Sequence, residues 1–235
     1  MGLGDHYISN GLVRQIYKDY KTANNTINLL CKKRFEENVK WMYQDLDLSI
    51  IAVPDDPEAR QVFSTFDGEK ISGFGFQGMK TNKGNEVFNE HAVYLKHSYV
   101  PKVRYEMFKF HRDKDLEHRI YEEIINFDEP YVFVADDAER GYIIDITKVI
   151  KEPIKIIRSD ELRNYKIHEL LGVVENAQSS HVMYSSFFLL IDALNIRPLY
   201  VHETYLKKIE VYMNPDHPQY KPMMKHWKKR NVTFV

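Results

Sequence analysis

The chain has 235 residues, of which 43% are hydrophobic, and its 33 lysines and arginines nearly balance its 34 aspartates and glutamates. That length accommodates one large or two lean α/β domains with a sizeable buried core. A net charge of −1 lacks the strong positive field typical of proteins that bind nucleic acid, so no nucleic-acid partner is expected.

Cysteine content and hydropathy restrict the cellular compartments in which the protein is expected. Cys31 is the only cysteine, which excludes an intramolecular disulfide and suits a reducing environment. No apolar stretch has the length of a membrane span, and no basic and apolar leader precedes Gly2. A basic run at 223–231 is interpreted as a solvated helix face. We therefore expect a cytoplasmic protein, in a cell or in an infected host, without a membrane span.

The first part of the chain alternates helix and strand. Ile8, Leu12, Ile16 and Tyr20 recur four residues apart and predict a helix over 8–20. The patterns that follow predict a strand at 27–31, a helix at 35–44, a strand at 48–53 and a helix at 54–66. This alternation is typical of a parallel sheet.

The middle of the chain is less regular. Residues 68–85 hold five of the ten glycines, which indicates turns or a mobile loop near a ligand. Aromatic residues and histidines crowd 89–112. The amphipathic pattern of 113–127 predicts a helix that we expect to connect two halves.

The alternation resumes in the last hundred residues. Expected strands occupy 131–137, 141–146, 154–159, 180–185 and 198–203, and expected helices occupy 168–178, 186–195 and 220–230. The fold class predicted is α/β, with two Rossmann-like lobes of mostly parallel sheet at 1–125 and 126–235. Ligands of such folds bind outside the carboxyl ends of the strands, so the loops after strands are the places to search.

The opening GLGDH, at 2–6, has two glycines directly before a helical pattern, as in a loop between a strand and a helix. Gly4 lets backbone amides approach a bound group closely, and the amino end of a helix favours anions. The stretch lacks the third glycine of a dinucleotide motif and the lysine of a P-loop. Asp5 is either a general base facing a cleft or a helix cap.

A second stretch, SHVMYSSFFLLIDAL at 180–194, places two serines between a buried strand and an apolar helix. We expect the free amides of the first helical turn and the hydroxyls of Ser185 and Ser186 to form a phosphate-binding site. A plain helix cap explains one of these serines but not both.

A third stretch, YVFVADDAERGYIID at 131–145, carries Asp136, Asp137 and Arg140 after a strand. An arginine there can clamp a diphosphate with two parallel hydrogen bonds. The alternative is a hairpin turn in which Asp136 or Asp137 pairs with Arg140 at the surface. Arg158, at the end of the strand near 154–157, either touches a nucleotide or is an exposed polar residue that leads a helix.

Three segments, GLGDHYISNGLVRQI, VFVADDAERGYIID and VVENAQSSHVMYSSFFLLIDAL, resemble in that order a group of glycosyltransferase-like proteins of bacteria and large viruses. These proteins are distantly similar to heptosyltransferases and fucosyltransferases of the two-lobed GT-B fold. The resemblance spans the first twenty residues and most of 130–205.

The resemblance implies transfer of a sugar from a nucleoside diphosphate sugar to the hydroxyl of a glycan or other acceptor, with inversion and without a metal. It assigns Asp5 as the base and places the donor diphosphate on Arg140 and on the amino end of the helix at Ser185 and Ser186. We further expect His6 to tune Asp5. The candidate substrate-binding set is completed by residues at the same loops: Gly4, Asp136, Asp137, Arg158 and Tyr184. No cofactor is expected besides the donor substrate.

Departures from the resemblance leave alternatives open. Relatives carry an acidic residue where this chain has Tyr184 and a histidine at the position of Ala135, and the strand expected before the GLGD loop is missing from the sequence. These features also fit a catalytically inactive binding or structural protein, for example in a viral assembly. Asp136 and Asp137 further resemble the acidic motif of metal-dependent, single-lobed GT-A transferases. The histidine spacings match no compact zinc site.

Overall fold

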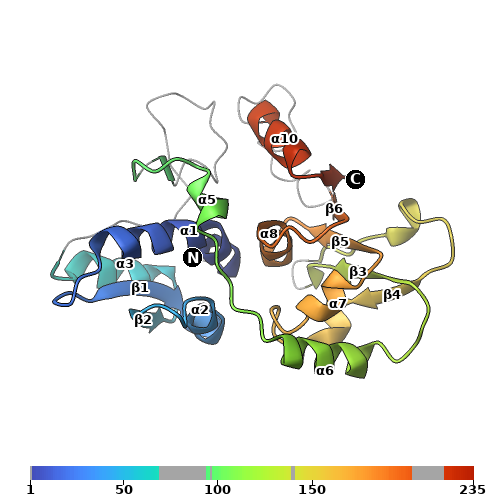
Figure 1. The fold of residues 1–235 in the computed structure, drawn as a ribbon, viewed down its shortest axis with the longest axis horizontal. Helices are drawn as coiled ribbons and strands as arrows, with labels where there is room; N and C mark the ends of the chain where they lie inside the picture. The colour runs from blue at the N-terminus through green and yellow to red at the C-terminus, as the bar shows by residue number, and fades with distance from the viewer. Residues whose placement is uncertain (1, 69–93, 96, 139–140, 203–219) are drawn as a thin grey trace. The chain divides into compact units, whose positions relative to one another are not determined.

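The computed structural model describes residues 2–68, 94–95, 97–138, 141–202 and 220–235. The chain forms two compact units, Met1–His111 and Arg112–Val235 (Figure 1). The helix that was expected to connect two halves, α6 (Lys114–Ile124), belongs to the second unit. The glycine-rich stretch at 68–85 lies outside the described residues except for Gly68.

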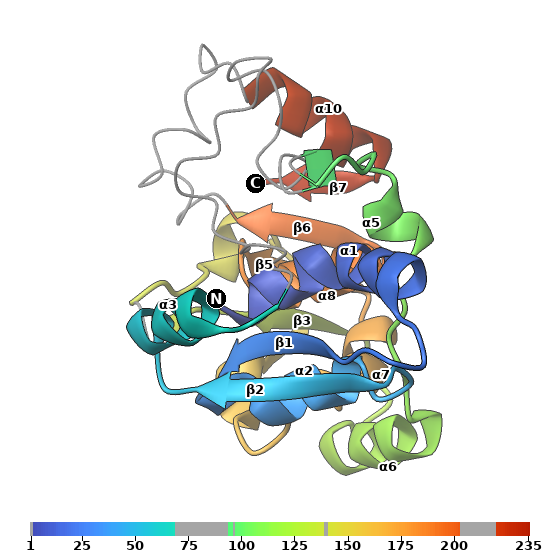
Figure 2. The same cartoon turned by 90° about the vertical axis from the view of Figure 1, so that its left-hand side faces the viewer.

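The first unit contains a parallel pair of strands with helices around it (Figure 2). Its elements are α1 (Leu3–Tyr20), β1 (Ile27–Lys32), η1 (Lys33–Phe35), α2 (Glu36–Met42), β2 (Leu48–Val53), α3 (Asp56–Thr65) and α5 (Val103–Glu106). Ile27 lies opposite Leu48 and Lys32 opposite Val53, so the two strands match along their whole length. Parallel pairing is as expected. A complete Rossmann-like sheet in this unit stays a prediction, because its described residues form these two strands.

The expected loop at GLGDH is wrong, because α1 begins at Leu3 with Gly2 at its N-cap. Asp5 occupies the third helical position, and its Oδ2 accepts a hydrogen bond of 2.6 Å from the backbone N–H of Gly2. An acidic side chain in the first turn satisfies a free amide and interacts favourably with the helix dipole. The same residues that indicated a loop therefore start the helix.

Helix α1 is held against the rest of its unit by polar contacts and by a glycine. The side-chain amide of Asn10 bonds both backbone groups of Lys109, at 3.2 and 3.1 Å. Arg14 donates to both carboxylate oxygens of Asp45, at 3.0 and 2.9 Å. A Cβ at Gly11 would lie 2.4 Å from the carbonyl oxygen of Val103, so only glycine allows α5 to approach this closely.

The second unit is built on a five-stranded, entirely parallel sheet. Its elements are α6, β3 (Tyr131–Ala135), η3 (Ile146–Lys148), β4 (Lys155–Arg158), η4 (Ser159–Leu162), α7 (Leu171–Glu175), β5 (Ser179–Met183), α8 (Ser186–Ala193), β6 (Leu199–His202), α10 (Tyr220–Lys229) and β7 (Val232–Phe234). The strand order is β4-β3-β5-β6-β7, which is the doubly wound order 2-1-3-4-5 of flavodoxin-like folds. The predicted parallel α/β sheet is confirmed for this unit.

The expected strand at 141–146 does not form. Asp137 and Tyr142 make a single antiparallel bridge, and Gly141 between them has φ of +76°, a conformation that glycine adopts without strain. The backbone N–H of Ile144 then donates to the Asp136 carboxylate at 2.7 Å instead of to a neighbouring strand. Ile144 and Ile146 pack on the sheet against Val132, Val134 and Met183.

Two polar networks and one close helix contact support the second unit. Arg112 bridges the carboxylates of Glu117 and Glu175, and a Cβ at Gly172 would lie 2.8 Å from the carbonyl oxygen of Glu117. Asp192, which is fully buried in α8, accepts hydrogen bonds of 2.7 Å from Arg197 and from Arg230.

Candidate functional site

Six of the residues singled out in the sequence lie at the carboxyl ends of three neighbouring strands in the second unit. They are Asp136 and Asp137 after β3, Arg158 at the end of β4, and Tyr184, Ser185 and Ser186 after β5. The chain winds outward from β3 to β4 on one side and from β5 to β6 on the other, so the β3–β5 junction is the topological switch point. Open α/β sheets bind ligands at this position. We call these six residues the switch-point site.

Asp136 anchors the switch-point site. Its side chain is 2% exposed; Arg158 forms an ion pair with its Oδ2 and the Ile144 amide donates to its Oδ1. Arg158 also donates to the carbonyl oxygen of Ile144 at 3.2 Å and keeps a quarter of its side chain exposed. The pair fixes the segment after β3 and presents a partly exposed guanidinium at the edge of the sheet.

The loop after Asp136 matches the expected turn in part. Asp137 bonds Tyr142 through both backbone groups, at 2.9 and 3.0 Å, and Gly141 donates to the carbonyl of Ala138. Arg140 lies outside the described residues, so its proposed pairing with the donor diphosphate stays a prediction. The ionic partner of Asp136 is Arg158, from the adjacent strand.

The start of α8 differs from an ordinary helix cap. Ser185 is the N-cap residue, but its side chain makes no capping hydrogen bond. Its Oγ is buried and has no hydrogen-bond partner within the described chain. The first-turn amides of α8 therefore donate no bond to this hydroxyl, and Ser186 follows as the first helical residue. A buried donor group beside free amides is the arrangement that an oxyanion would satisfy.

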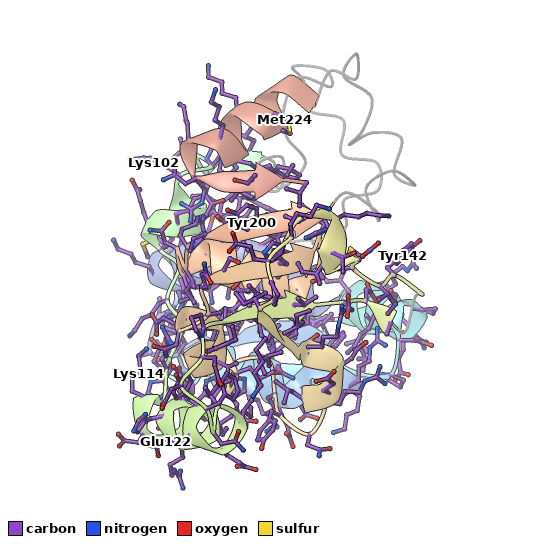
Figure 3. All side chains as sticks on the ribbon, turned by 90° about the vertical axis from the view of Figure 1, so that its right-hand side faces the viewer. Lys102, Lys114, Glu122, Tyr142, Tyr200 and Met224 are labelled. Carbon is purple, nitrogen blue, oxygen red and sulfur yellow. The ribbon has the colours of Figure 1, made fainter. Side chains whose placement is uncertain are left out.

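Two histidines that sequence reasoning did not select lie on neighbouring strands beside the switch-point site. His181 Nδ1 and His202 Nε2 are 3.1 Å apart, and Ser179 Oγ lies 3.0 Å from His181 Nε2. The His181 ring stacks on Tyr200 at a centroid distance of 4.8 Å. Tyr200 lies on β6 (Figure 3). His202 is the last residue of β6 and therefore lies, like Asp136, at the carboxyl ends of the parallel strands.

Burial governs the protonation of these histidines. It lowers the pKa of both His181 and His202 to about 4, and the Asp136 carboxylate opposes the shift at His202. Both rings are therefore neutral near pH 7. The register of β5 and β6 places His181 opposite Tyr200 and His202 opposite Met183. The sequence carried no local signal for this pairing.

Gly4, Asp5 and His6 belong to the first turns of α1 in the first unit. Burial raises the pKa of Asp5, although the hydrogen bond from Gly2 lowers it in part. His6 is fully buried, its ring nitrogens have no hydrogen-bond partner among the described residues, and burial lowers its pKa to about 3. Asp5 thus lies in the first turn of α1, and its surroundings raise the pKa of its carboxyl group.

In the described ranges, no group of three or more histidine, cysteine, aspartate or glutamate side chains is arranged to hold a metal ion. His118 lies 3.3 Å from Glu122 on the surface of α6, and His91 falls outside those ranges. Asp136 is occupied by Arg158 and a backbone amide.

Comparisons with protein-family models, with curated proteins and with solved structures gave no match to this chain. Among the helices of the described residues, none combines the length and the apolar character needed to cross a bilayer.

Proposed function

We propose that the chain is a glycosyltransferase-like enzyme that binds a nucleoside diphosphate sugar at the switch-point site and transfers the sugar to an acceptor hydroxyl. The observation that carries the proposal is the start of α8, where a buried Ser185 hydroxyl without a described partner adjoins free helix amides at the switch point of a doubly wound sheet. Helix amino ends of this kind favour phosphate groups. A phosphate site of this kind does not distinguish among phosphate ligands, and we choose a nucleotide sugar because of the sequence resemblance.

In the proposed reaction, the bond between the acceptor oxygen and the anomeric carbon forms as the bond from that carbon to the diphosphate breaks, with inversion. Asp5 takes the acceptor proton, and its raised pKa suits a general base. The departing diphosphate carries away the electron pair. It is stabilised by the amides and hydroxyls of Ser185 and Ser186, by Arg158 and by Arg140.

Calorimetric titration with nucleoside diphosphates and nucleotide sugars tests the binding step. Ser185→Ala should weaken the binding of the preferred nucleotide by roughly 10- to 100-fold, which corresponds to the loss of a hydrogen bond to a charged group. Thr233→Ala, which removes an exposed hydroxyl from β7, is the matched control and should bind like the unmodified protein. Absence of binding by every nucleotide would overturn the proposal.

Turnover is measured separately, as slow hydrolysis of the donor. Asp5→Asn keeps an oxygen that can accept from the Gly2 amide but removes the base. This variant should lose turnover and retain nucleotide binding. Binding by the unmodified protein without any turnover would instead identify an inactive transferase fold that holds a nucleotide. A dependence of binding on added Mn²⁺ would favour the GT-A-like alternative, against which the engaged carboxylate of Asp136 argues.

A further inference from the structure

A cavity of about 550 Å³ lies within the first unit. Its walls come from α1, from β1 with the turn before it, from β2, and from α3 with the residues after it. Most of the wall is apolar, including Ile16 on α1, Ile51 on β2 and Phe63 on α3.

The cavity runs along the backbone edge of β1. Four consecutive residues of β1, 27–30, line it together with 25 and 26 before the strand, whereas one face of a strand contributes only every second residue. One edge of β1 is paired with β2 along its whole length. The cavity lies at the other edge of β1, because Ile51 is the one residue of β2 in the described lining. In a parallel ladder, alternate residues of a strand direct both N–H and C=O away from a given neighbour. The cavity therefore meets a row of backbone donors and acceptors.

Two helices of the first unit, α1 and α3, contribute to the wall of the cavity. The Lys32–Asp56 ion pair, at 2.8 Å, joins β1 to the start of α3, and Leu30 and Ile51 are register partners that line the cavity with Phe63. Ile16 comes from α1, which packs with α2. The space is thus lined by apolar side chains of α1, α3 and β2 and by the backbone edge of β1.

The two strands are also unusually exposed for a parallel pair. Among the twelve residues of β1 and β2, only Leu29, Cys31 and Val53 are buried. Parallel strands in α/β proteins are normally covered on both faces and paired at their edges. Filling the cavity beside β1 would extend the sheet and bury more of these apolar side chains.

We propose that this cavity binds an extended polypeptide segment, which pairs with β1 as an additional strand. An apolar small molecule would fill the space but would leave the edge amides and carbonyls of β1 without partners, whereas a peptide backbone satisfies them. The occupant has a centre of β-branched apolar residues. Asp67, an exposed carboxylate at the rim of the cavity, favours a basic residue at one end of the segment.

The probe for the full chain is the peptide acetyl-KVIVIVK-amide, titrated by calorimetry together with a version methylated on its central backbone nitrogens. The unmodified peptide should bind, and the methylated peptide, with the same side chains but without central donors, should bind at least about tenfold more weakly. Amide hydrogen exchange of β1 should slow on binding. Equal binding of the two peptides, or no binding of either at millimolar concentration, would overturn the proposal.

Surface variants locate the binding. Phe66 is 37% exposed and lines the cavity, so Phe66→Asp should weaken binding of the peptide without unfolding the protein. Val100→Asp is the matched control, since Val100 is 51% exposed in the same unit and is not part of the lining. Asp67→Asn should reduce the preference for the lysine-flanked peptide over one flanked by glutamines. If Val100→Asp weakens binding as much as Phe66→Asp does, the peptide binds elsewhere and the proposal fails.

Discussion

Replacing His202 by glutamine should reduce the loss of stability that the second unit suffers in acid. His181 and His202 are 1% and 6% exposed and share a hydrogen bond of 3.1 Å. Burial lowers the pKa of each from its ordinary value near 6.5 to about 4. The unfolded chain therefore takes up protons below pH 6.5 that the folded chain does not bind. The stability present above pH 6.5 is lost as the pH falls towards 4.

The size of the effect follows from those two values. A single histidine with a pKa of 6.5 when unfolded and about 4 when folded reduces the free energy of unfolding by roughly 2 kcal/mol between pH 7.5 and pH 5. His202→Gln should remove about that much of the acid loss. Glutamine retains a side-chain amide that can bond the ring of His181, so the variant is expected to fold.

Urea unfolding at pH 7.5 and at pH 5 measures the difference. Trp227 is fully buried in the second unit and contacts Phe188 at a centroid distance of 4.9 Å, so its fluorescence reports unfolding there. Trp41→Phe removes the other tryptophan, which belongs to the first unit. His118→Gln, at an exposed position of α6, controls for the loss of a histidine as such. An acid loss in His202→Gln equal to that of the unmodified chain would refute the reasoning.

Four further substitutions test the packing of the second unit by urea unfolding. Ser185→Ala should change the free energy of unfolding by less than about 0.5 kcal/mol, because the Ser185 hydroxyl makes no capping bond. Asp113→Ala should lower it by about 1 kcal/mol, because the Asp113 carboxylate accepts a hydrogen bond of 2.9 Å from the third helical amide of α6. Equal losses in the two variants would contradict this reasoning. Gly172→Ala should cost about 1–3 kcal/mol, since its Cβ would lie 2.8 Å from the backbone oxygen of Glu117, and an unchanged transition would show that the helices separate freely. Asp192→Asn should cost roughly 3 kcal/mol because it removes the charge that faces two arginines at 2.7 Å, and a neutral result would mean that these arginines find other partners.

Local sequence patterns were sufficient for most of the strands. The runs at 27–31 and 48–53 correspond to β1 and β2 within one residue, and the apolar segment at 131–135 forms the buried strand β3. Patterns failed where a short-range signal had two meanings. The glycines of GLGDH indicated a loop, but the carboxylate of Asp5 bonds the Gly2 amide and starts α1 there. The apolar alternation of 141–146 indicated a strand, but those side chains pack on the face of the sheet.

The sequence by itself determined the α/β class of the second unit and the positions of the polar residues that follow its strands, because hydrophobic periodicity and helix starts depend on neighbouring residues. Only the tertiary structure decided which of these residues meet. Asp136 pairs with Arg158, 22 residues away, and His181 with His202, 21 residues away, because β4 and β5 both lie against β3 and β6 lies against β5. The order of parallel strands, and with it these two long-range contacts, results from packing between segments that local patterns cannot relate.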